Sequence, residues 1–476
     1  MVLLALGVLV GYIIIGTILA VASRRYLRGV SEKEIFIAGG RMGGFLSALT
    51  YAATTYSAFM IVGLVGFTYD WGVGSFGFEI TYFVATVGLL VAFAPRVWRM
   101  ARKRGWVSPG EMLADLYGSR WLAVIASLIY LVALIPYASA QVKGIGDAFA
   151  GLAGEDAYIL GVGLALVVML VWSLVAGIWS VAVTDAFQGL WMLAAATGLL
   201  AWLYLKLAGS GLGLGEATGI LASEGLLGLE GYWPPAKFLA FTLPWIFFAV
   251  TNPQVVQRLY IPRDEASLAR MVRWFAVFGL YYTVLVTLIG LLARAGVEAG
   301  LLPEPPSRDA VTPTLLSLTH PLLAAVVFTS IVAAAVSTAD SILLTLASSV
   351  SRDLGWMVEE KRRRALAVAA VLLVAVAMAG VAAARVGYIV GLSVLSSVML
   401  LSLAPATIAA WAGYKAHPLA AAASIVSGFT LVAALIVYYR NPLAVFTATP
   451  LGLPVAAWVL TVSTLIVLIG VMARRT

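Results

Sequence analysis

The chain has 476 residues, of which 62% are hydrophobic and only 11% charged. A soluble domain of this length could not keep so much apolar surface from water, so the composition predicts an all-α polytopic membrane protein. The formal net charge of +8 comes from short basic runs between apolar segments, so no nucleic-acid partner is expected. With no Cys and only two His, the chain has no disulfide and no thiolate metal site, and no organic cofactor is expected.

Apolar runs of about 20 residues predict about thirteen membrane-spanning helices. They begin near Val2, Gly43, Gly74, Trp121, Tyr158, Val181, Phe238, Ala269, Leu322, Ala365, Val386, Leu419 and Leu453. Basic residues follow the first, third, seventh and ninth spans, as at Arg24, Arg99, Arg258 and Arg352, whereas the opposite loops carry acids such as Glu155. The positive-inside rule then predicts a multi-pass plasma-membrane protein with its N-terminus outside and its C-terminus in the cytoplasm. The lipid bilayer is the partner that this implies, and no obligate protein partner is evident.

The second and the seventh spans are predicted to be interrupted. The second contains the small and polar run 52–58 followed by Gly63 and Gly66, and the seventh contains Asn252 and Pro253. Proline removes a backbone donor and commonly kinks or breaks a helix. The two spans are five helices apart, so two five-helix units that each open with one of them would lie in opposite orientations, as in transporters with a binding site at the bilayer midplane. A Pro-kinked helix with Gly packing is the alternative.

The ninth span carries polar side chains inside an apolar segment. Ser337, Thr338 and Asp340 lie in the run 328–353. An Asp at mid-bilayer costs about 2.5 to 3.5 kcal/mol on insertion scales, so such groups usually mark an ion or solute pathway. Hydroxyls and free carbonyls suit a partly dehydrated sodium ion. The alternative is that the hydroxyls only bond back to their own helix.

Four motifs, in order along the chain, resemble the sodium:solute symporter family from about residue 32 to residue 415. They are Ala38-Gly39-Gly40-Arg41 with Ser57-Ala58, Thr184-Asp185-Ala186-Phe187-Gln188, Asn252-Pro253-Gln254 with Gln257-Arg258, and Val336-Ser337-Thr338-Ala339-Asp340-Ser341 with Arg352-Asp353-Leu354. The resemblance implies a single transmembrane transporter domain with an inverted-repeat core in spans two to eleven. The expected parts are a first helix and cytoplasmic loop (1–42), a first repeat (43–206), a second repeat (236–412) and two peripheral helices (418–476).

The resemblance also implies the residues of the ion site. The sodium ion would be held by the carbonyl groups of Ala53, Tyr56 and Ala334 and by the hydroxyls of Ser337 and Thr338. Some relatives bind a second cation, and here the matching positions are Asp185, Asp340 and Ser341. Asp185 is alternatively expected to stabilise the cytoplasmic mouth by bonding neighbouring backbone.

The solute site is implied by resemblance to sodium/proline, sodium/pantothenate and sodium/galactose symporters. The matching positions are Thr55, Met60, Glu79, Trp245, Asn252, Pro253 and Ser397. Glu79 and Asn252 match positions that contact sugar, but Thr55, Met60 and Ser397 stand where sugar transporters carry amides, and sugar hydroxyls would be left unsatisfied. A compact amino acid such as proline, or an organic acid such as pantothenate, is therefore expected as the small-molecule partner.

The fourth span contributes two further polar residues, Gln141 and Lys143. Lys143 is expected either to pair with Asp147 one helical turn later or to attract a carboxylate of the solute. Tyr137 is expected to be an interfacial anchor rather than a ligand.

The sequence therefore predicts a sodium-coupled symporter that imports a small organic solute by alternating access, with sodium as the coupling ion. A proton-coupled or uncoupled transporter of the same fold and a sugar symporter are alternatives. A channel is the alternative from a different class, although the chain has no ring-forming filter motif. An enzyme is not expected, because no acids are paired at a catalytic spacing.

Overall fold

The computed structural model describes residues 2–29, 31–175, 177–229 and 231–474, and in these ranges the regular structure is helical throughout. Twelve helices are long and apolar enough to cross a membrane, and a bent pair of helices at residues 44–71 makes a thirteenth. The predicted all-α polytopic class with about thirteen spans is confirmed.

The first half of the chain forms six spans. They are α1 (Val2–Ser23); the bent pair of α3 (Gly44–Thr55) with η3 (Phe59–Leu64) and α4 (Val65–Trp71); α5 (Val73–Arg104); α7 (Arg120–Ala153); α8 (Tyr158–Val175); and α9 (Gly177–Gly209). Short helices connect some of them, namely α2 (Glu32–Ile37), α6 (Pro109–Tyr117) and, after α9, α10 (Leu214–Ser223).

The second half forms seven spans. They are α11 (Pro235–Ile246) with α12 (Phe248–Thr251) and α13 (Pro253–Arg258); α14 (Glu265–Glu298); α16 (Pro321–Ser349) with η6 (Val350–Leu354); α17 (Glu360–Ala383); α18 (Ile389–Leu400) with α19 (Ala404–Ala412); α20 (Pro418–Tyr439); and α21 (Val455–Ala473). The connection between α14 and α16 contains η5 (Arg308–Ala310) and α15 (Val311–Leu318).

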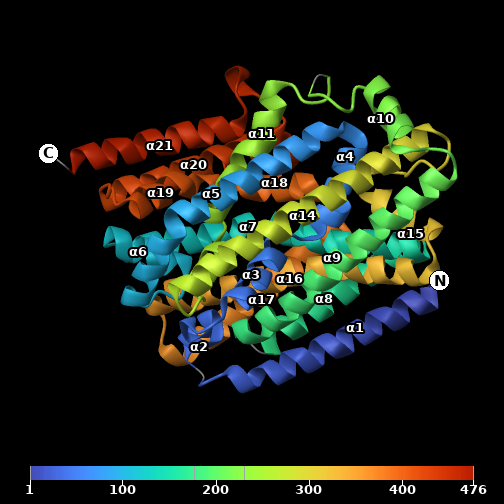
Figure 1. Ribbon diagram of the computed structural model, residues 1–476. Helices are drawn as coiled ribbons and strands as arrows, with labels where there is room; N and C mark the ends of the chain where they lie inside the picture. Colours follow the sequence, from blue (N-terminus) through green and yellow to red (C-terminus); the bar gives the residue numbers. More distant parts are fainter. Residues whose placement is uncertain (1, 30, 176, 230, 475–476) are drawn as a thin grey trace.

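The two halves interleave in space. Helix α14 packs on α3, α16 packs on α9 and α7, and α18 packs on α7. Most of α16 and α18 is buried, whereas α1, α20 and α21 lie at the margins of the bundle (Figure 1). The polar residues of the ninth span therefore lie in the centre of the protein, out of contact with lipid.

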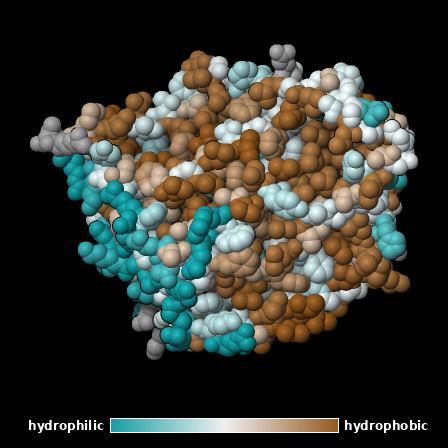
Figure 2. Space-filling model, in the orientation of Figure 1, coloured by the Kyte–Doolittle hydropathy of each residue, from teal (hydrophilic) through white to brown (hydrophobic). Residues whose placement is uncertain are grey.

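The surface has the division expected of a membrane protein. Figure 2 shows hydrophilic residues gathered at the end of the bundle where α2 and α6 lie, while hydrophobic residues cover much of the remaining face. We call this end of the bundle the arginine-rich end, because Arg104 pairs there with Asp115 of α6 and Arg352 pairs with Glu32 of α2 and Glu111 of α6. An apolar belt with charge concentrated at one end is what the positive-inside pattern predicts.

Both predicted interruptions are present. Helix α3 ends at Thr55, and the backbone of the next residue, Tyr56, is extended (φ −96°, ψ 105°). The chain resumes in the π-helical turn η3, and the segment Phe59–Trp71 is bent by 51° from α3. The seventh span loses helical geometry at Asn252 (φ −83°, ψ 113°), and Pro253 then starts α13. Interruptions of this kind free backbone carbonyls and amides inside the bundle, where other groups must satisfy them.

Gly66 on α4 allows the loop at η5 to approach the bent span closely. A Cβ at this position would lie 2.1 Å from the carbonyl oxygen of Arg308, whereas a Cβ at Gly88, on an exposed face of α5, would meet no atom within 4 Å. We expect Gly66→Ala to lower the free energy of unfolding by about 1–3 kcal/mol through overpacking. Gly88→Ala should leave it unchanged or raise it slightly. Thermal unfolding of the two variants checks this, and equal melting temperatures would contradict it.

Candidate ion and solute sites

The break in α3 faces the polar stretch of α16. The Ser337 hydroxyl lies 2.9 Å from the Ala53 carbonyl oxygen and 3.1 Å from the Ala334 carbonyl oxygen. The Thr338 hydroxyl lies 3.2 Å from the Ala53 carbonyl oxygen and 3.4 Å from that of Thr54. Hard oxygen atoms from two distant segments therefore converge at one buried point, which is the donor set that a small monovalent cation requires.

Four of the five predicted sodium ligands, Ala53, Ala334, Ser337 and Thr338, meet in this cluster. Tyr56 is the first residue beyond the last turn of α3, and its ring packs on Phe275 and Phe278 of α14. The Thr54 carbonyl oxygen was not among the ligands predicted from the sequence. We use the name oxygen cluster for the carbonyl oxygens of Ala53, Thr54 and Ala334 together with the hydroxyl oxygens of Ser337 and Thr338.

Gln141 on α7 supports the break. Its side-chain oxygen accepts a hydrogen bond from the Ala58 amide at 3.2 Å, and its side-chain nitrogen donates to the Tyr137 carbonyl at 3.1 Å. The Ala58 amide lies just beyond the break, so Gln141 satisfies a donor that the interrupted helix leaves free. This contact gives Gln141 a positioning role.

A buried charge pair lies beside the oxygen cluster. The Arg258 guanidinium donates to Ser341 at 2.5 Å and lies 3.9 Å from the Asp185 carboxylate, which also accepts from the Thr50 hydroxyl at 2.5 Å. Ser341 is 2.8 Å from the Thr54 hydroxyl, so this network reaches the residue that follows Ala53. Asp185 and Ser341 were both predicted as ligands of a second cation. In the structure both face the guanidinium of Arg258.

The prediction that Arg258 is a basic loop residue was wrong. Arg258 is fully buried at the end of α13, where its guanidinium also donates to the Gln254 carbonyl at 3.0 Å. The distribution of charged residues along the sequence cannot distinguish this buried arginine from a loop arginine, because its partner Asp185 is far away in the sequence. Asp185 contacts the side chains of Thr50 and Arg258, which differs from the predicted bonding to neighbouring backbone. Asp340 is also buried, on α16.

An aromatic cluster lies where the two interrupted spans approach each other. The Trp245 ring is 5.1 Å from Phe59, 5.2 Å from Tyr82, 5.2 Å from Phe248 and 6.2 Å from Tyr137, as measured between ring centroids. We call these five residues the aromatic cage. Tyr137 is buried and its hydroxyl lies 3.5 Å from that of Ser57, so the prediction of an interfacial anchor was wrong.

Unsatisfied polar atoms surround the aromatic cage. Both carboxylate oxygens of Glu79, the Trp245 indole nitrogen and the Tyr82 hydroxyl are buried with no hydrogen-bond partner among the described residues. Glu79 precedes Tyr82 by three positions on α5, so both side chains lie on one buried helix face. Buried polar groups in native proteins are usually paired, and either bound water or a solute can supply the partner for these atoms.

The other nominated solute residues are buried on the elements around the cage. Met60 is on η3, Asn252 and Pro253 are at the second interruption, and Ser397 is on α18, which packs on η3 and α11. Thr55 donates back to the Tyr51 carbonyl at 2.8 Å within α3.

Lys143 holds two carboxylates at the end of the bundle away from α2 and α6. Its ammonium group lies 2.6 Å from Asp147 on α7 and 2.7 Å from Asp309 on η5. Asp309 also accepts from the Ile389 amide at 3.0 Å, at the start of α18. The Asp147 contact is the one predicted for an ion pair, and the sequence did not indicate Asp309.

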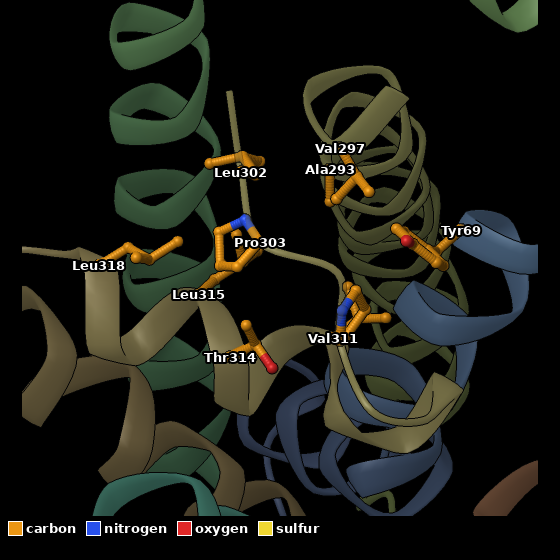
Figure 3. A pocket seen from close by; sticks show the side chains of 10 residues that line it. Tyr69, Ala293, Val297, Leu302, Pro303, Val311, Thr314, Leu315 and Leu318 are labelled. Atoms are coloured by element: carbon orange, nitrogen blue, oxygen red, sulfur yellow. The ribbon is translucent and has the colours of Figure 1, made fainter. Parts of the chain in front are cut away.

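A chamber of about 520 Å³ opens beside Lys143, with charged lining residues from several helices. Its charged residues are Asp70, Lys143, Arg294, Glu304, Arg308 and Asp309. A second, apolar pocket lies between α4, α14 and α15 (Figure 3), lined by Tyr69, Val297 and Leu315 among others. Its volume of about 10 Å³ is no larger than a water molecule requires. The chamber, unlike this pocket, is large enough to admit a small solute.

Comparison with known proteins identifies the class. A family model described as the sodium:solute symporter family matches residues 35–411. Because that match covers most of the chain, the protein belongs to the sodium:solute symporter family, which confirms the resemblance drawn from the four motifs.

Individual relatives are distant. The chain is 22% identical to the monocarboxylate transport permease protein of Rhizobium johnstonii, over 65% of this chain and 62% of that protein. It is 26% identical to a sodium/proline symporter of Staphylococcus aureus, over 74% of this chain and 68% of that protein. A substrate-bound, outward-open Na⁺-coupled sialic acid symporter has the same fold, with a TM-score of 0.79 and 18% identity over 99% of this chain and 98% of that one.

Proposed function

We propose that the protein is a sodium-coupled symporter that imports a small organic solute across the plasma membrane by alternating access. The observation that carries the proposal is the convergence of the Ser337 and Thr338 hydroxyls on the Ala53 carbonyl at a helix break. A sodium ion bound there would link α16 to α3 and stabilise one arrangement of the two. Such a link can only drive transport through its different affinity for the two states.

The solute would bind at the aromatic cage, between the two interrupted spans. Glu79, Trp245 and Asn252 are the polar residues that we assign to it, together with Thr55, Met60, Pro253 and Ser397. The chamber beside Lys143 would be the entry from outside, because it lies away from the arginine-rich end, which we assign to the cytoplasm. The two repeats would then be 43–206 and 236–412, with the helices at 1–42 and 418–476 at the periphery.

A sodium titration of the purified protein tests the ion site without knowledge of the solute. We expect sodium, but not potassium, to raise the melting temperature and to change the tryptophan fluorescence in a saturable manner, since an ion that binds only the folded protein stabilises it. The variant Ser337→Ala/Thr338→Ala should need about tenfold more sodium or lose the response, because two buried oxygen ligands are missing.

The matched control is Ser349→Ala, which removes a buried hydroxyl from the same helix, twelve residues beyond Ser337. At about 1.5 Å per residue this position is about 18 Å away along α16, so the sodium response should be unchanged. Equal responses of the wild type to sodium and potassium would refute sodium coupling and leave proton-coupled or uncoupled transport as the function. Uptake that does not saturate would favour a channel.

A further inference from the structure

Helix α1 lies at the margin of the bundle, where it packs on α9 and α16 (Figure 1). Its buried residues recur every three or four positions and form one face, namely Ala5, Leu9, Tyr12, Gly16, Ala20 and Ser23. Small and apolar side chains are enough to seat a helix face of this kind on its neighbours in a membrane. The buried hydroxyl of Tyr12 is therefore more than the docking of α1 requires.

Tyr12 contacts two residues of the 184–188 motif on α9. The Gln188 side-chain nitrogen donates to the Tyr12 hydroxyl at 2.7 Å, and the rings of Phe187 and Tyr12 are stacked with their centroids 5.6 Å apart. Tyr12 and Gln188 are both buried, so neither side chain can exchange this hydrogen bond for one to bulk water. The orientation of Gln188 is thus held from α1.

Gln188 shares a helix face with Asp185, which lies three positions earlier on α9. Asp185 accepts from the Thr50 hydroxyl of α3 at 2.5 Å, and Thr50 lies about one turn before Ala53, whose carbonyl belongs to the oxygen cluster. The polar face of α9 therefore contacts α1 through Gln188 and α3 through Asp185. A shift of this face would reach the half of the oxygen cluster that α3 supplies.

Tyr12 also lies close to the half of the oxygen cluster that α16 supplies. Its hydroxyl is within electrostatic range of Asp340 on α16 and of Asp185 on α9. Because the hydroxyl oxygen accepts from Gln188, its proton is available for donation to a carboxylate. Asp340 follows Thr338 by two positions, so Tyr12 is placed between α9 and the stretch of α16 that carries the ion site.

We propose that Tyr12 is a positioning residue for the sodium site, which holds α9 against α16 through Gln188 and Asp340. The inference rests on the proposed sodium binding and adds α1, a helix outside the two repeats, to the elements on which the ion site depends. The oxygen cluster joins α3 to α16, so a change in the packing of α16 alters the distances among its oxygens. Binding sites lose affinity when the residues that support their ligands are loosened.

The variant Tyr12→Phe removes the hydroxyl and keeps the ring. We expect binding of radioactive sodium to the purified full chain, measured well below the melting temperature, to need about three- to tenfold more sodium for half saturation, because a hydrogen bond between neutral groups is lost. Gln188→Leu, which keeps the size of the side chain, should have a similar effect. The double variant should bind no more weakly than the weaker single variant, since both changes remove the same contact.

Leu9→Ala is the matched control for the attachment of α1. Leu9 is buried on the same face as Tyr12, three positions earlier, and its side chain has only apolar atoms. The substitution leaves a cavity between α1 and its neighbours, so it should lower the melting temperature. It should leave the half-saturating sodium concentration unchanged, and that difference separates positioning of the ion site from docking of α1.

Unchanged or tighter sodium binding by Tyr12→Phe and Gln188→Leu would overturn the inference, and so would additive losses in the double variant. A loss of affinity in Leu9→Ala as large as that in Tyr12→Phe would also overturn it, because the ion site would then depend on the attachment of α1 alone. Failure of the proposed function is read on the wild type: a wild type that binds no sodium refutes sodium coupling and this inference together.

Discussion

Replacing Arg258 with Met is expected to destabilise the protein by about 3–5 kcal/mol, because the substitution leaves Asp185 as an uncompensated charge in the protein interior. The side chain of Arg258 is entirely buried, and that of Asp185 nearly so. The substitution also removes the donor that holds Ser341 at 2.5 Å, and Ser341 in turn contacts Thr54 beside the oxygen cluster. The affinity for sodium should therefore fall together with stability. Thermal unfolding and the sodium titration measure the two effects.

The double variant Asp185→Asn/Arg258→Met separates charge from shape. It removes both charges, so it should recover most of the stability lost in Arg258→Met, as is found when both partners of a buried pair are replaced by neutral groups. If a second sodium ion were bound by Asp185 instead, Arg258→Met would leave the melting temperature high in sodium and low in potassium. Equal losses in the single and the double variant would contradict the assignment of these residues as a pair.

The elements of the fold were predictable because each is a local property of the chain. Runs of about 20 apolar residues predict spans whatever surrounds them, and the polar run 52–58 and Pro253 interrupt two of those runs. The Ser337 and Thr338 hydroxyls were recognisable for the same reason, since polar groups in a membrane segment are conspicuous. The polar residues that mark the breaks and the ion site are recognised from neighbours within about one helical turn in the sequence.

The contacts that complete the sites could not be predicted, because they join distant residues. Thr54 and Ser341 are 287 positions apart, and Lys143 and Asp309 are 166 positions apart. A tyrosine such as Tyr137 is equally compatible with a membrane interface and with a buried cage, and only packing decides between them. The buried positions of Arg258, Tyr82 and Tyr137 were missed for the same reason. Whether each side chain is buried depends on which helices pack against each other.

Replacing Lys143 with Met is the second change expected to have a large effect. Asp309 is nearly buried and Asp147 is mostly so, with 5% and 18% of their side chains exposed. Without the ammonium group the two carboxylates repel each other, and the loss should be about 3–5 kcal/mol of stability. Because Asp309 is on η5, the connection that contains it should also detach from α7, which would open the chamber to solvent. Thermal unfolding and proteolysis of the 299–320 connection would measure both effects.

The variant Lys143→Met/Asp309→Asn decides whether Lys143 acts on structure alone. An Asn side-chain oxygen can still accept from the Ile389 amide, as Asp309 does at 3.0 Å, and Asp147 alone retains access to water. Stability should return to near the wild-type value, and with it the binding of the transported solute, if Lys143 only ties η5 to α7. If stability returns and binding does not, Lys143 attracts the solute's carboxylate.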